Sequence, residues 1–168
     1  YGTHDFGRYC LLARTLLENG AACVKVTHHG YDSHAENFNF HLEQLGEFDK
    51  PFSMLLDDLK AQGMLESTLV VIYSEFGRTP KISANVGRDH WPRANTMLFA
   101  GGGIQTGQVI GATNDKAEHP VERPVKPADF CAIVYHALGI DPHQEVVKDF
   151  SGRPNFLLKG GEVPPELL

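Results

Sequence analysis

The chain has few cysteines and no long apolar run, and these absences exclude several classes of protein. Its 168 residues include three cysteines, Cys10, Cys23 and Cys131, which lie far apart without a C-x-x-C pair. Such spacing is typical of small buried hydrophobic residues rather than of a zinc knuckle or a disulfide framework. No segment reaches the roughly 18 consecutive apolar residues of a transmembrane helix, so we expect no membrane span.

Positive charge is also scarce. Fifteen Lys and Arg against 21 Asp and Glu give a formal net charge of −6 at pH 7. Proteins that bind the nucleic-acid backbone concentrate Lys and Arg on one face, so we expect no nucleic-acid partner. The glycine-rich residues 101–107 lack the G-K-[ST] of a phosphate-binding loop, and the chain has no G-x-S-x-G nucleophile elbow.

What the sequence does contain is an alternation of helical and strand-like segments. Helical periodicity covers residues 7–18, 35–62 and 127–138, and Pro51 predicts a kink or a break into two helices within the second. Strand-like apolar runs cover residues 21–27, 69–73 and 95–100. This order predicts an α/β fold with a mostly parallel sheet flanked by helices, in a single domain over residues 1–168.

Three groups of polar residues follow strand ends or lie in the loop between strands. They are Asp32-Ser33-His34, Glu75, and Asp89-His90. Ligands of open α/β sheets bind outside the carboxyl ends of the strands, which places a carboxylate such as Glu75 well for chemistry. Carboxylate oxygens and imidazole nitrogens are the donors that a divalent cation prefers in proteins. The three groups are therefore candidate metal ligands.

Each of these residues also has a structural interpretation that the sequence leaves open. Glu75 fits an ordinary surface loop, and Asp32 fits a cap that accepts from the first amides of the following helix. His90 fits a histidine wedged beside Trp91 and bonded to the backbone, and Arg78 fits a solvated or ion-paired loop arginine.

Several motifs occur together in a characteristic order: Gly30-Tyr31-Asp32-Ser33-His34, Ser74-Glu75-Phe76-Gly77-Arg78-Thr79-Pro80, Gly87-Arg88-Asp89-His90-Trp91 and Tyr135-His136-Ala137-Leu138-Gly139-Ile140. With them the chain resembles the carboxyl-terminal part of the domain-of-unknown-function 1501 family, sulfatase-like bacterial proteins of the alkaline phosphatase superfamily. The resemblance covers nearly the whole chain. It implies an alkaline-phosphatase-like fold, of which this chain is a fragment.

The resemblance also implies a chemistry, because two metal ions position a phosphate or sulfate ester in that superfamily. Carried over by order, Asp32, His34 and His90 resemble the ligands of one metal, and Glu75 resembles a ligand of the other or a bridging carboxylate. Arg78 is the candidate catalytic residue, neutralising a substrate oxyanion. The implied cofactor is a divalent metal, zinc first, with calcium, magnesium or manganese as alternatives. The implied function is metal-dependent hydrolysis of a small-molecule or glycan ester.

Two departures from the superfamily pattern concern this site. The first metal pair is usually spaced more widely than D-x-H, and Phe76 stands where His commonly follows the second carboxylate. The nucleophile of the superfamily belongs to a segment upstream of the residues present, so we expect half of a site and little hydrolysis by the chain alone. The resemblance further implies an extracytoplasmic parent protein, periplasmic or secreted. The alternative function is a non-catalytic metal- or glycan-associated secreted domain.

Overall fold

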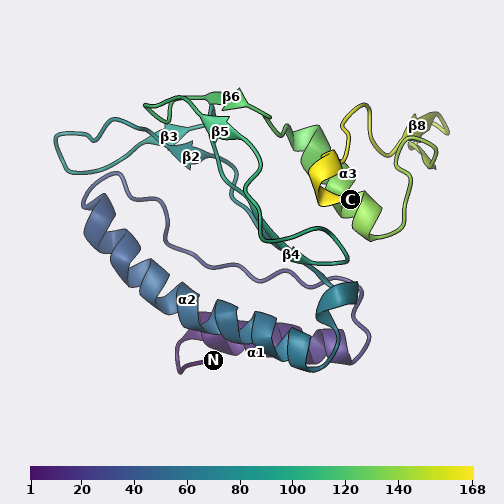
Figure 1. Cartoon of the computed structure of the whole chain (residues 1–168), viewed down its shortest axis with the longest axis horizontal. Helices are drawn as coiled ribbons and strands as arrows, with labels where there is room; N and C mark the ends of the chain where they lie inside the picture. The colour runs from purple at the N-terminus through teal and green to yellow at the C-terminus, as the bar shows by residue number, and fades with distance from the viewer. The chain divides into compact units, whose positions relative to one another are not determined.

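The computed structural model describes all 168 residues, which form two compact units (Figure 1). The first unit comprises Tyr1–Leu65 and Phe76–Pro92, and the second comprises Glu66–Glu75 and Arg93–Leu168. The expectation of a single domain that continues a longer alkaline-phosphatase-like domain stays a prediction.

The first unit is built on two packed helices, α1 (Asp5–Glu18) and α2 (Asn37–Ala61), which lie side by side in Figure 1. Apolar residues at helical spacing give each helix a buried stripe, and the stacked rings of Phe6, Phe48 and Phe52 join the two stripes. Both helices were predicted. α2 is continuous through the buried Pro51, so the alternative of two separate helices is wrong.

Between these helices the chain is extended but forms no strand. Residues 21–27 keep the alternation of a strand, with Val24 and Val26 half-buried and Lys25 and Thr27 exposed. No backbone hydrogen bond forms along residues 22–30. The strand predicted here is therefore wrong, because no neighbouring strand of this chain pairs with it.

A short hairpin completes the first unit. β2 (Gly77–Arg78) pairs antiparallel with β3 (His90–Trp91), and Arg78 stands opposite His90. The loop between them folds onto the start of α2, where the carbonyls of Asn85 and Val86 accept the amides of Glu36 and Asn37 at 3.1 and 3.0 Å. These bonds satisfy helix amides that would otherwise lack partners, and they tie the hairpin loop to α2.

The second unit packs helix α3 (Pro127–Ala137) near a two-stranded ladder of β1 (Leu69–Ile72) and β4 (Leu98–Gly101). Its core contains Ile104, Ile133 and Leu167. The remaining elements are β5 (Ala112–Thr113), β6 (Pro120–Glu122), β7 (Val146–Lys148), β8 (Pro154–Phe156) and the 3₁₀ turns η1 (Leu65–Ser67) and η2 (Pro165–Leu167). α3 begins at Pro127, as predicted, and no helix of the chain is both long and apolar enough to cross a membrane.

The predicted mostly parallel sheet flanked by helices is wrong. The structure contains four separate ladders of two strands each, β1–β4, β2–β3, β5–β6 and β7–β8, and all four are antiparallel. β1 is half-buried rather than covered on both faces. A parallel pair needs a crossover, usually a helix, and the connection from β1 to β4 contains only the β2–β3 hairpin.

Candidate metal centre

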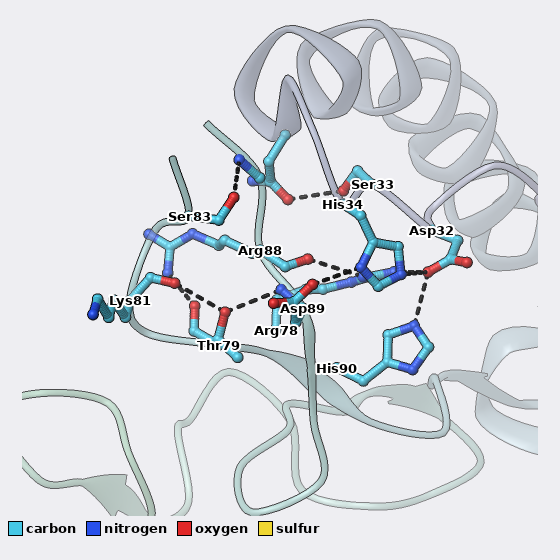
Figure 2. Close-up of polar contacts among 12 residues, drawn as sticks. Asp32, Ser33, His34, Arg78, Thr79, Lys81, Ser83, Arg88, Asp89 and His90 are labelled. Atoms are coloured by element: carbon cyan, nitrogen blue, oxygen red, sulfur yellow. Dashed lines mark hydrogen bonds and ion pairs between the residues drawn. The ribbon is translucent and has the colours of Figure 1, made fainter. Parts of the chain in front are cut away.

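The first half of the candidate site is the turn that precedes α2. Ser33 is buried, and its hydroxyl donates to Oδ1 of Asn37, the first residue of α2, at 2.8 Å. The N-cap of α2 is Glu36, which makes no side-chain capping bond. The Asp32 carboxylate is thus not used for helix capping, and it projects with His34 from a turn that Ser33 anchors (Figure 2).

The second half comes from the β2–β3 hairpin. Thr79 and Asp89 extend its pairing: the Thr79 amide donates to the Asp89 carbonyl at 2.9 Å, and the Asp89 amide donates to Thr79 Oγ1 at 3.0 Å. Arg88 closes the loop by donating from Nη1 to the carbonyls of Thr79 and Pro80 at 2.7 and 2.8 Å. These bonds fix the backbone on which Asp89 and His90 stand.

Gly87 joins the two halves. A Cβ at this position would lie 1.8 Å from the His34 carbonyl oxygen and 2.6 Å from the Ala35 nitrogen. Only glycine lets the hairpin loop approach the turn this closely. The approach brings residues 32 and 34 beside residues 89 and 90.

Four side chains of the first unit meet at one carboxylate oxygen. Asp32 Oδ1 lies 2.8 Å from His90 Nε2, 3.0 Å from His34 Nε2 and 2.9 Å from Arg78 Nη2. Figure 2 shows both imidazoles directed at this oxygen. Asp32, His34 and His90 each offer one ligand atom, and these three atoms all lie within 4.8 Å of one another.

These contacts change the acid–base behaviour of Asp32. The hydrogen bond from His90, followed by that from Arg78, lowers the pKa of the Asp32 carboxyl to about 2. The carboxylate is therefore charged at any physiological pH and available as an oxygen donor. Its other oxygen, Oδ2, takes part in none of these contacts, which leaves capacity for both the guanidinium and an ion.

His34 lies between two carboxylates. Its Nδ1 is 2.7 Å from Asp89 Oδ1, and its Nε2 is 3.0 Å from Asp32 Oδ1. The hydrogen bond with Asp89, and secondarily the charge of Asp32, raises the pKa of His34. The sequence placed Asp89 with His90 among the candidate ligand groups, but its partner His34 is 55 residues away and no local pattern indicates this pairing.

The His90 ring stacks on Phe76, with the ring centroids 4.2 Å apart and an interplanar angle of 27°. Its Nε2 faces Asp32, so the structure does not support a packing histidine bonded to backbone. Phe76 was noted in the sequence as a departure from the superfamily pattern. In the structure it is the surface against which His90 is oriented.

Arg78 is only 17% exposed and has three acceptors. Nη2 donates to the Tyr31 carbonyl at 2.6 Å and to Asp32 Oδ1 at 2.9 Å, while Nη1 donates to the Arg88 carbonyl at 3.1 Å. The guanidinium thereby joins the turn to the hairpin loop and holds Asp32 in place. Its predicted contact with a substrate oxyanion stays a prediction.

Glu75 belongs to the second unit, three residues after β1, and is exposed. The structure thus groups Asp32, His34 and His90 within the first unit. The role of Glu75 as a ligand of the same centre or of a second metal stays a prediction.

Comparison with known proteins gives a family. The model of the family described as "Protein of unknown function (DUF1501)" matches residues 1–168. No curated protein and no solved structure matches the chain. Because the match spans the whole chain, this protein belongs to the DUF1501 family.

Proposed function

We propose that Asp32, His34 and His90 bind a divalent metal ion, zinc first among the candidates, and that the chain is part of a metal-dependent hydrolase of phosphate or sulfate esters. The observation that carries the proposal is the convergence of one carboxylate oxygen and two imidazole nitrogens within 4.8 Å. The sulfatase-like character of the motifs points to the ester substrate.

The donor set fits zinc. Zinc–nitrogen and zinc–oxygen bonds of about 2.0–2.1 Å in a tetrahedron place the ligand atoms about 3.3 Å apart. Asp32 Oδ1 is 2.8 Å from His90 Nε2 and 3.0 Å from His34 Nε2, and all three ligand atoms lie within 4.8 Å of one another. Three protein ligands leave one position of the tetrahedron for water or substrate, as in catalytic zinc centres.

A bound ion would supply Lewis-acid stabilisation of charge on the ester oxygens. The residues of the chain do the rest. Asp32 is kept ionised by Arg78 and His90, and the turn and hairpin hold the two imidazoles toward it. The three ligand residues are exposed, so a substrate can reach them. We place the nucleophile outside residues 1–168.

The test combines metal content with hydrolysis. Wild type and the Asp32→Asn and His29→Ala variants are dialysed against Zn²⁺ and analysed for bound metal. His29 is a matched control, because it is an exposed histidine of the same unit outside the cluster. We expect wild type and His29→Ala to bind zinc and Asp32→Asn to lose it. Equal zinc content in all three would end the metal assignment.

Hydrolysis is then measured on p-nitrophenyl phosphate and p-nitrophenyl sulfate, with both residues 1–168 and a longer protein that includes upstream sequence. We expect turnover by the longer zinc-loaded protein, lost in its Asp32→Asn variant, and little by residues 1–168, because removal of a nucleophile costs orders of magnitude in rate. Zinc binding without turnover by the longer protein would instead favour the non-catalytic, metal-associated alternative.

A further inference from the structure

His34 and His90 lie at the same centre but are oriented in different ways. The His90 ring rests on Phe76, and its Nε2 lies 2.8 Å from Asp32 Oδ1. His34 instead uses both ring nitrogens, Nδ1 toward Asp89 and Nε2 toward Asp32. A neutral imidazole carries one N–H and one lone pair, and the hydrogen bond at one nitrogen decides which nitrogen is free to bind metal.

We infer that Asp89 is a positioning residue: it accepts the Nδ1–H of His34 and so commits the Nε2 lone pair of that ring to the metal. The inference rests on the proposed metal centre and deepens it. The Nδ1–Oδ1 distance of 2.7 Å is that of a strong hydrogen bond to a charged acceptor. Metal-binding histidines commonly donate their second nitrogen to a carboxylate in this way, which fixes tautomer and ring orientation.

Asp89 is itself held for this task. Its amide donates to Thr79 Oγ1 and its carbonyl accepts from the Thr79 amide, so its backbone is fixed at the edge of the hairpin. The carboxylate is exposed, and Oδ1 contacts His34 Nδ1. A substitution of its side chain therefore removes the hydrogen bond with His34 while leaving the backbone bonds to Thr79 in place.

The first readout is the tautomer of His34 in the metal-free protein. Long-range ¹H–¹⁵N spectra at alkaline pH, with the signals assigned through His34→Gln, report which ring nitrogen carries the proton. We expect the Nδ1–H form in wild type, because the contact of Nδ1 with Asp89 at 2.7 Å is closer than that of Nε2 with Asp32 at 3.0 Å. This preference should be lost in Asp89→Ala and kept in Asp89→Asn, whose amide oxygen still accepts. An unchanged His34 spectrum in Asp89→Ala would overturn the inference.

The second readout is the affinity for Zn²⁺ alone, by calorimetry. We expect Asp89→Ala to weaken binding by about 10- to 100-fold, the usual effect of removing such a partner. Asp89→Asn should bind more tightly than Asp89→Ala, and Asp57→Asn should match wild type as a control for the lost charge, because Asp57 is an exposed residue of α2.

The two readouts separate the possible failures. If Asp89→Asn keeps the wild-type tautomer but binds zinc as weakly as Asp89→Ala, the carboxylate is itself a ligand and the positioning role is wrong. If wild type binds no Zn²⁺ while Asp89→Ala still changes the tautomer, Asp89 positions His34 but the proposed metal function fails.

Discussion

Replacement of Gly87 by alanine offers a severe test of how the two halves of the site are joined. The added Cβ would lie 1.8 Å from the His34 carbonyl oxygen and 2.1 Å from its carbonyl carbon. Ordinary contacts at Cβ begin at 3.4 Å. Both clashing atoms belong to the backbone, so a change of side-chain rotamer cannot relieve them, and the hairpin loop must move away from the turn that carries His34.

The expected loss of folding stability in Gly87→Ala follows from the cost of overpacking. Inserting a methyl group where no space exists typically costs about 1–3 kcal/mol. If the loop escapes this strain by separating His90 and Asp89 from His34, the cost falls on metal binding, where it corresponds to a loss of about 5- to 140-fold in affinity. Zinc titration by calorimetry and urea unfolding of the metal-free protein measure the two quantities.

Gly46 provides the matched control. It lies within α2, and a Cβ there would meet no atom within 4 Å. Gly46→Ala should therefore stabilise the protein, by about 0.5–1 kcal/mol, since alanine loses less backbone entropy in a helix. It should leave zinc affinity unchanged. Wild-type stability and wild-type zinc affinity in Gly87→Ala would refute the close approach of loop and turn.

Three further predictions concern the same cluster. His90→Ala should reduce zinc affinity by more than about 100-fold, which is the upper end of the effect of losing a supporting residue. His136→Ala, at an exposed residue of α3 outside the cluster, should leave the affinity unchanged. Equal metal content of the two variants by elemental analysis would remove His90 as a ligand. The pKa of Asp32 is lowered to about 2, so its contribution to stability is complete above about pH 4 and is lost as the pH falls toward 2. The pKa of His34 is raised, so its contribution is complete below about pH 6.5 and is lost as the pH rises through its folded-state pKa. Urea unfolding against pH should show both losses, and Asp32→Asn should flatten the acid side. Arg78→Lys should cost about 1–3 kcal/mol in urea unfolding, because the single nitrogen of an ammonium cannot take the places of both Nη1 and Nη2 and leaves an acceptor unpaired. Wild-type stability would show that the guanidinium bridge is dispensable.

The helices could be predicted from sequence because their signals are local. Apolar spacing marks α1 and α2, and Pro127 marks the start of α3. The direction of strand pairing has no such signal. The β-branched residues of β1 favour a strand whichever way its partner runs, and only the connection to β4 decides that the pair is antiparallel.

For the candidate site, the sequence predicted the residues but not the contacts that hold them. Its candidate ligands could be identified by type and spacing, and three of the four, Asp32, His34 and His90, meet in the first unit. What the sequence could not reveal is how they are held. The acceptors of Arg78 include two backbone carbonyls, and every residue has a carbonyl, so nothing in the side-chain pattern identifies Tyr31 and Arg88 as its partners.

The cluster separates into exposed candidate ligands and a less exposed scaffold. The side chains of Asp32, His34 and His90 are 70%, 49% and 46% exposed, whereas that of Arg78 is 17% exposed and Ser33 is buried. Substitutions of exposed residues usually change stability little, while loss of a buried bridge changes it substantially. A ligand variant that loses metal yet unfolds like wild type therefore reports on coordination. A scaffold variant that loses both metal binding and stability reports on the contact between the turn and the hairpin. Comparison of the two classes of variant then tells whether the cluster binds an ion or only holds the two loops together.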